Sequence, residues 1–362
     1  MEKLLDFVDI ALVPSEKNGG VGKYEFGMED LLEGSNFKSL PIFTSPMDSI
    51  VDERNWKTWA DNGIRPVLPR TTPLDIRLEG CRYIFSAFSL KEVAENFLNR
   101  RQSGNGGLLR VCIDPGNGHD TKVFEIGKAL KAAYGNGINL MGGNIGNPKT
   151  YGEYCKTGFD YVRVGMTGGS LVNHSAHGFA YPQASLLIDT LGVKNTSLTG
   201  LKHTKIVSDG GITGPTDILK AIALGADYVM IGREFAKLVE AAGSILRKNE
   251  DGVLEPIEKG EMAANLTEEE LKMSGLVRLY AANTSYEMQA KRGGFEDIHD
   301  WLGAPGMKRN MSDARVDQVK IVRTLKSWLA EMYQTFNYGF TMSGARNWET
   351  YKSNIRYVRV QI

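Results

Sequence analysis

Short apolar runs alternate with segments of helical apolar spacing along most of the chain. The runs are PIFTSPM, GIRPVLPR, YIFSAFS, LLRVCIDP, INLMGGNI, YVRVGM, KIVSDGGI and YVMIGR, and the helical segments include DTKVFEIGKALKAAYG, NPKTYGEYCKTG and GPTDILKAIALG. A strand buried on both faces reads as a continuous apolar run, so the pattern predicts eight parallel strands with helices between most of them. We therefore expect an α/β fold, namely a TIM (β/α)8 barrel.

A long polar, glycine-containing region at about 248–315 interrupts this alternation after the last βα unit. Its length is typical of a mobile flap over the barrel mouth. A helical stretch, DARVDQVKIVRTLKSWLAEMYQTF, then leads to the closing run IRYVRV. We expect one barrel domain over residues 1–362, with the long flap as an insertion and a C-terminal helical extension.

The charge balance and the cysteines limit the possible partners and the compartment. The 43 basic and 43 acidic side chains cancel, so no overall field attracts nucleic acid or an anionic membrane. Cys81, Cys112 and Cys155 are too few and too far apart for a disulfide framework, which fits a reducing compartment. We find neither a signal-peptide pattern nor an apolar run of about 18 residues. We expect a cytoplasmic protein without nucleic-acid or membrane partners.

Polar residues and glycines gather where the predicted strands end, which is where barrels of this type bind their ligands. Backbone N–H groups at glycines and at a following helix start bind phosphate well, because nothing blocks its close approach. A strand-end aspartate suits the vicinal hydroxyls of a ribose. The alternative is that the glycines only form tight turns. The strand-end residues are Asp48, Asp114, Asn144, Gly165 to Ser170, Asp209, Gly210, Gly211, Gly232 and Arg233.

Two of these positions leave alternatives open. Arg233 is placed either for a charge-assisted contact with a phosphate, or as a solvated side chain or an ion pair with Glu234 or a helix carboxylate. Asp114 favours a role in orienting a nicotinamide or a ribose. Asn117 and His119, which follow it after a glycine turn, fit an Asx-type turn or a helix cap equally well.

His174 and His177 lie in the loop that follows the run YVRVGM. Either histidine is suited to acid or base catalysis near neutral pH, whereas exposed loop histidines are usually only solvated. A third metal ligand is not apparent, so we predict no metal site. Ser170, Ser175 and the cysteines lack a recognisable nucleophile motif.

Several motifs together resemble those of the IMP dehydrogenase and GMP reductase family, over nearly the whole predicted barrel. They are FVDIALVPS, SPMDSI, IDPGNGHD, MGGNIGNPKTY, VRVGMTGGS, YPQAS, SDGGITGPTDILKAIALGADYVMIGR and LYAANTS. The segment GFAYPQ is more similar to the reductases. The tandem regulatory domains of many dehydrogenases have no room between VLPR and YIFSAFS.

The resemblance implies a homotetramer that binds a purine nucleoside monophosphate (GMP, IMP or a deoxy form) with NADP or NAD stacked beside the base. It also implies a monovalent cation at the loop from Gly165 to Gly169, although Thr167 replaces a glycine there. By resemblance, Ser170, Gly211, Gly232 and Tyr280 contact the phosphate, Asp209 the ribose, Ser45 and Met47 the nucleotide pocket, and Asp114, Asn144 and Arg163 the nicotinamide and base.

The cysteine that serves as the family's nucleophile has no counterpart in this chain. In the family it follows the glycine-serine pair by two positions, where this chain has Leu171 or Val172. Asn173 or His174 replaces the threonine that assists nearby, and the acidic flap residue of the reductases has no counterpart in HDWLGAPGMKRNM. Aliphatic side chains cannot attack a purine, so turnover by the usual covalent route is not expected.

Three hypotheses follow. The first is a purine nucleotide oxidoreductase with altered chemistry, in which His174 and Asp114 are the candidate catalytic residues and His174 activates a water. The second is a catalytically silent nucleotide sensor or partner subunit. The third is an FMN-dependent barrel enzyme, because such barrels also hold a phosphate with a DGG turn and a later glycine-arginine pair, here Gly232 and Arg233.

Overall fold

The computed structural model describes residues 4–16, 39–99, 107–166, 179–196, 204–257, 266–281 and 316–360. Eight strands form one parallel sheet in the order β2-β9-β8-β7-β6-β5-β4-β3. A parallel bridge between Phe43 and Arg65 joins β2 to the segment before β3 and completes the ring. The strands are β2 (Ile42–Thr44), β3 (Val67–Leu68), β4 (Phe85–Phe88), β5 (Leu109–Ile113), β6 (Ile138–Ile145), β7 (Tyr161–Val164), β8 (Lys205–Asp209) and β9 (Tyr228–Ile231).

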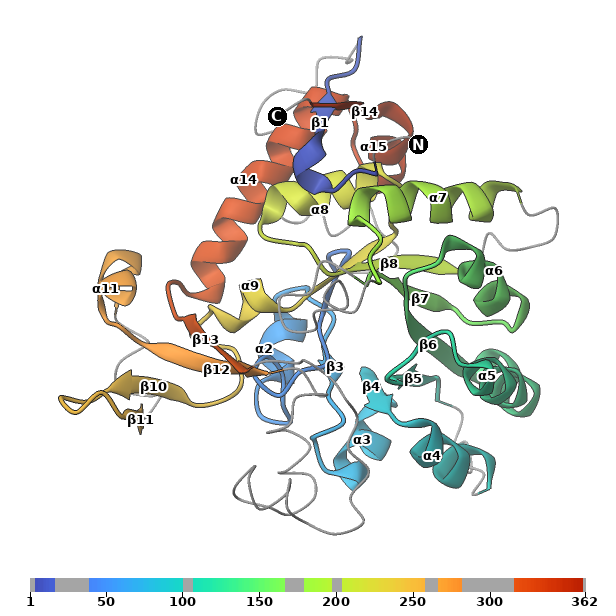
Figure 1. Cartoon of the computed structure of the whole chain (residues 1–362), viewed down its shortest axis with the longest axis horizontal. Coiled ribbons are helices and arrows are strands. Elements are labelled where there is room, and N and C mark those ends of the chain that lie inside the picture. Colours follow the sequence, from blue (N-terminus) through green and yellow to red (C-terminus); the bar gives the residue numbers. More distant parts are fainter. Residues whose placement is uncertain are drawn as a thin grey trace.

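Each of the eight predicted apolar runs contains one of these strands, which confirms the TIM barrel. Helices surround the sheet (Figure 1). Local sequence fixes where they begin: Asp120 accepts a hydrogen bond from the Lys122 amide at the start of α5, and Pro148 opens α6 after the capping Asn147. The helices are α2 (Trp56–Asp61), α3 (Leu74–Gly80), α4 (Leu90–Val93), α5 (Thr121–Tyr134), α6 (Pro148–Lys156), α7 (Gln183–Thr196), α8 (Pro215–Ala223) and α9 (Arg233–Ala236).

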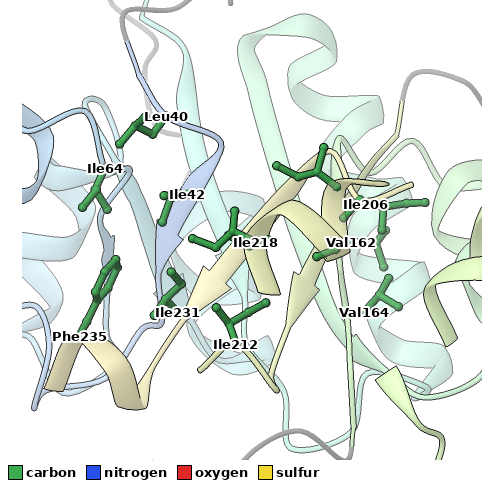
Figure 2. Packing of buried hydrophobic residues seen from close by; sticks show 14 of the residues in the cluster. Leu40, Ile42, Ile64, Val162, Val164, Ile206, Ile212, Ile218, Ile231 and Phe235 are labelled. Atoms are coloured by element: carbon green, nitrogen blue, oxygen red, sulfur yellow. The ribbon is translucent and has the colours of Figure 1, made fainter. Parts of the chain in front are cut away.

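Strand residues alternate between an outer and an inner apolar cluster. The outer cluster lies between sheet and helices; Figure 2 shows Ile42 and Ile231 of neighbouring strands in this cluster with Ile218 of α8. On β5, Val111 and Ile113 belong to the outer cluster and Cys112 to the inner one. Cys112 therefore lies buried inside the barrel. The inner cluster consists of Phe43, Val67, Phe85, Ala87, Cys112, Met141, Val207 and Met230.

A second, antiparallel sheet follows the barrel strands, in the order β11-β10-β12-β13. Its strands are β10 (Ile245–Lys248), β11 (Leu254–Ile257), β12 (Val277–Ala281) and β13 (Val316–Lys320), with helix α11 (Glu268–Met273) before β12. Strands β11 and β12 of this sheet thus lie within the expected flap region. Residues 258–265 and 282–315 lie outside the described residues.

The C-terminal helical stretch begins later than predicted. Residues 316–320 form strand β13, because their backbone pairs with β12 over five residues from Val277↔Lys320 to Ala281↔Val316. Helix α14 (Leu325–Ser343) begins only after Thr324, whose side chain accepts a hydrogen bond from the Ser327 amide. The alternation in VDQVK suits a strand with one buried face, and Val319 is indeed buried.

The closing run IRYVRV contains strand β14 (Arg356–Arg359), which follows helix α15 (Trp348–Asn354). It pairs antiparallel with β1 (Ile10–Val13), which follows the short 3-10 helix η1 (Phe7–Asp9). In Figure 1 this pair lies beside α8, away from β10–β13. No helix within the described ranges is long and apolar enough to cross a membrane.

Candidate functional site

The carboxyl ends of four neighbouring barrel strands bring the predicted polar residues together. Asp114 directly follows β5, Asn144 lies in β6, Arg163 in β7 and Asp209 at the end of β8. These strands are consecutive in the sheet, so their ends share one rim. Two hydrogen-bonded pairs result, and each joins strands that are not adjacent.

The first pair is Arg163 with Asp114. Arg163 Nη2 donates to Asp114 Oδ1 at 2.7 Å and to the Gly143 carbonyl at 3.0 Å. The Arg163 side chain is 3% exposed, while that of Asp114 retains 15% exposure at the rim. The Nε of Arg163 has no acceptor among the described residues. The pair therefore fixes the Asp114 carboxylate at the mouth with part of its surface open.

The second pair is Asn144 with Asp209. Asn144 Nδ2 donates to Asp209 Oδ2 at 2.6 Å. Burial raises the pKa of Asp209, although Arg163 and the Asn144 amide favour the charged form. Within the described part of the chain, Oδ1 accepts no hydrogen bond. This oxygen is therefore available for a ligand hydroxyl.

Ser45, Gly232 and Tyr280 meet at the end of β9. A methyl group on Gly232 would lie 2.6 Å from the Tyr280 hydroxyl and 3.3 Å from Ser45 Oγ, so only glycine allows this approach. Tyr280 is buried, and burial raises the pKa of its hydroxyl, so the group remains a hydrogen-bond donor.

The glycine turn after β8 follows at the same edge, since Asp209 lies opposite Met230 of β9. Gly210 and Gly211 have φ values of 112° and 75°, a region that favours glycine. Among the described residues, no acceptor is found for the amides of Gly210, Gly211 and Gly232. The two turns thus serve the backbone conformation, and the Gly232 turn lies beside two hydroxyl groups.

The group formed by Ser45, Gly232 and Tyr280 is called the cup below. Arg233, which directly follows Gly232, forms an ion pair. Its Nη1 lies 2.6 Å from Asp317 Oδ2 of β13, with the two side chains 39% and 33% exposed. Glu234, the partner considered from sequence, pairs with Lys237 instead. Arg233 therefore forms an ion pair, but with a strand carboxylate 84 residues further along the chain and not with Glu234 or a helix carboxylate.

Met47 lies in the turn after β2, half-buried against the outer core cluster. Its amide donates to the Ser45 carbonyl at 2.8 Å. The turn therefore holds Ser45 against Gly232, and the contact of Met47 with a nucleotide remains a prediction.

Ser170, His174, Leu171 and Val172 lie in 167–178, outside the described residues. The residues that bound this segment are at the mouth. At Gly165, a methyl group would collide with the Asp209 carbonyl, so β7 and β8 are in close contact there. Gly165, which precedes this segment, therefore lies directly beside Asp209.

Gln183 at the other end of that segment was missed as a positioning residue, because the sequence analysis used YPQAS only as a family motif. The side chain is fully buried, and its Nε2 donates to the Val164 carbonyl at 2.8 Å and to Ser208 Oγ at 3.0 Å. Its Oε1 has no partner within the described residues. A glutamine directly after a proline at a helix start was the available signal.

The residues after Asp114 form a turn, as one of the two alternatives proposed. Asn117 Oδ1 accepts from the His119 amide at 3.0 Å. The Gly146 amide donates to His119 Nε2 at 3.1 Å, so the proton lies on Nδ1, which is 2.9 Å from Thr150 Oγ1. Burial lowers the pKa of His119, which keeps it neutral. His119 thus fastens the turn to the asparagine loop.

None of the three cysteines is placed as a nucleophile. Burial raises the pKa of Cys112 to about 12 and that of Cys81 to about 11, and it also raises the pKa of Cys155. A thiol with such a pKa holds little thiolate at neutral pH.

Comparison with known proteins identifies one family. The model of the IMP dehydrogenase / GMP reductase domain matches residues 104–361. GMP reductase of Bacillus subtilis (strain 168) is 30% identical over 257 residues, which cover 69% of this chain and 76% of that protein. GMP reductase 1 of Homo sapiens and of Mus musculus are each 34% identical over 140 residues, so this match spans only 39% of either relative.

Proposed function

Because this chain belongs to the IMP dehydrogenase / GMP reductase family, we propose that it is a purine nucleotide oxidoreductase that binds a nucleoside monophosphate at the C-terminal mouth of its barrel. The observation that carries the proposal is the approach of Ser45 and Tyr280 to Gly232, at the strand end next to Asp209. Two hydroxyls and a set of free amides suit a phosphate, and a carboxylate suits ribose hydroxyls.

In this proposal the ligand is GMP, IMP or a deoxy form. Gly210, Gly211 and Gly232 donate their amides to the phosphate, and Ser170 adds a hydroxyl from the loop. Asp209 Oδ1 accepts from the ribose, while Asn144 keeps Oδ2 in place. We propose a homotetramer of this chain as the working form, which light scattering tests directly.

The nicotinamide cofactor is NADP or NAD, and it supplies or accepts the hydride at C2 of the purine. The residues present fit such a group, because Asp114 keeps a partly open carboxylate at the rim and the buried Arg163 has an Nε without an acceptor among the described residues. Asp114 and Asn144 orient the carboxamide side, and Arg163 holds Asp114 in place. The apolar residues below them, such as Cys112 and Met141, exclude water from beneath the site.

The chemistry at C2 proceeds without a thioimidate. Leu171 and Val172 occupy the place of the family's cysteine, and the raised pKa values of the remaining thiols argue against a substitute. We propose that a water activated by His174 adds to C2 of IMP while His174 takes the water proton, and C2 would then give up its hydride to NAD to leave the 2-oxopurine nucleotide. Loss of covalent catalysis raises the barrier, so slow turnover is expected.

The nicotinamide absorbance tests this proposal, with NADPH or NADH paired with GMP and dGMP, and NAD with IMP and dIMP. We expect turnover that survives treatment with iodoacetamide. His174→Ala should abolish turnover while nucleotide binding remains, and His177→Ala serves as the matched control. Full activity of His174→Ala would remove this residue from the mechanism.

A nucleotide sensor is the second candidate function, favoured by the loss of the cysteine from an otherwise assembled site. It predicts a thermal shift with one nucleotide and no turnover with any pair. The flavin alternative, which relied on Gly232 and Arg233 at the phosphate, predicts a yellow protein. A colourless purified protein would remove it.

A further inference from the structure

The charges around the phosphate cup are unusual for a site that receives an anion. Four charged residues lie close enough to the buried Tyr280 hydroxyl to affect its pKa: Asp209, Arg233, Asp317 and Glu234. Only Arg233 among these four is a cation, and Lys237 neutralises Glu234. A phosphate dianion at this place therefore depends on Arg233 to offset the neighbouring carboxylates.

Arg233 is already engaged by a carboxylate of the protein. It directly follows Gly232, and its guanidinium lies 6.0 Å from the centroid of the Tyr280 ring. Asp317, which holds it at 2.6 Å, lies directly opposite Tyr280 in the β12–β13 ladder. The cup hydroxyl and the competing carboxylate thus come from directly paired residues of one ladder, and both lie near the same guanidinium.

We propose that Asp317 is an internal competitor of the ligand phosphate for Arg233. A phosphate monoester that enters the cup takes the guanidinium from Asp317, so part of the new contact is offset by the ion pair that is lost. The inference rests on the proposed nucleotide site and concerns how much the phosphate contributes to the affinity for the nucleotide.

This competition has a physical purpose in an enzyme. A phosphate remote from C2 is held equally in the substrate and the transition state, so a stronger grip lowers KM without raising kcat. A carboxylate that competes for Arg233 offsets part of the binding free energy of the phosphate, so the nucleotide is released more easily. Asp317 is therefore a determinant of specificity for phosphate, acting through Arg233.

The test measures binding of GMP, guanosine and inorganic phosphate by calorimetry to the whole chain at low ionic strength. We expect Asp317→Asn to bind GMP and inorganic phosphate about two- to five-fold more tightly than wild type, the range of a partly exposed ion pair. Guanosine affinity should stay unchanged. Arg233→Met should weaken binding of both phosphate-bearing ligands.

Two further variants separate this role from a general effect. Glu153→Gln removes one negative charge from the exposed Lys156–Glu153 pair of α6 and should change none of the affinities. Asp317→Ser removes the same carboxylate with a smaller side chain and should reproduce the effect of Asp317→Asn. If the variants change GMP and guanosine affinity in parallel, Asp317 has only a structural role and the inference fails.

Weaker binding of GMP to Asp317→Asn would also overturn the inference, because the carboxylate would then position Arg233 rather than compete for it. An unchanged GMP affinity would exclude any exchange of partners. Failure of the proposed function is distinguishable: the wild type would then bind inorganic phosphate, tighter in Asp317→Asn, but show no gain from the purine nucleoside of GMP. Absence of all binding to wild type would overturn both proposals.

Discussion

The side-chain amide of Asn144 donates to the Asp209 carboxylate at 2.6 Å and so connects β6 to β8 across the end of β7. One carboxylate oxygen is occupied by this bond, and the other has no acceptor role among the described residues. Since Asp209 is also desolvated, the orientation of its free oxygen depends on a single amide. The pair therefore sets the direction in which the site accepts a ligand hydroxyl.

Removal of either member should weaken nucleotide binding. We expect Asp209→Ala and Asn144→Ala each to cost about 1–3 kcal/mol of binding free energy, as for an unmet buried hydrogen bond. Because both act on one interaction, the double variant should cost little more than Asp209→Ala alone. Calorimetric titration with GMP measures these values. Asn62→Ala, whose amide bonds the Thr58 carbonyl on the surface, is the control, and full additivity would contradict the shared role.

The Gly232→Ala variant tests the cup. The added methyl group would lie 2.6 Å from the Tyr280 hydroxyl, so we expect a loss of about 1–3 kcal/mol of stability, typical of overpacking, and weaker nucleotide binding. Tyr280→Phe removes the colliding oxygen, so the double variant should regain part of the stability. Urea unfolding gives the stability values.

The control for this variant is Gly192→Ala in α7, where nothing lies within 4 Å of the new methyl group. It should be neutral or stabilise the protein by about 0.5–1 kcal/mol, because alanine favours a helix. If Tyr280→Phe gives no relief to Gly232→Ala, the clash is not the cause of the loss.

The barrel fold could be predicted from the sequence because the barrel strands are buried on both faces. Each strand therefore reads as a continuous apolar run. Strand β13 was predicted as helix because its five residues gain strand hydrogen bonds only from β12, far earlier in the chain. The short alternation in VDQVK was the only local signal for a strand, and pairing with a distant segment decides the structure here.

The candidate site shows the same limit. Asp209 and Asn144 were named from their positions at strand ends, and the fold brings them into contact. The partner of Arg233 could not be identified from the sequence, because Asp317 lies in β13, which was predicted as helix. Gln183 was recognised as part of a motif, but its bonds to Val164 and Ser208 follow from the register of two strands.

The thiols should be inert in the native protein. Burial raises the pKa of Cys112 to about 12 and leaves its side chain without exposure, so a disulfide reagent such as DTNB should not modify it until the protein unfolds. Cys112→Ala should keep nucleotide binding, at a modest cost in core packing. Rapid native modification of Cys112 that blocks turnover would contradict this and revive a covalent route.

Asp227 should make stability depend on acid pH. Although burial opposes it, Lys352 and Lys194 at 2.8 and 2.9 Å lower the pKa of Asp227 to about 2. A depressed carboxyl pKa stabilises the fold above the unfolded value near 4, and this stability is lost as pH falls toward 2. At pH 7, Asp227→Asn should cost about 2–3 kcal/mol, because it leaves two partly buried lysines without their carboxylate.

The pH dependence separates this ion network from simple packing. The difference in urea stability between wild type and Asp227→Asn should narrow by about 1 kcal/mol at pH 3 and by about 2 kcal/mol at pH 2. Glu153→Gln, which breaks an exposed pair, should cost less than about 1 kcal/mol at pH 7. If the difference for Asp227→Asn is the same at every pH, the carboxylate does not carry its charge in the folded protein, and the lysines stabilise the fold in another way.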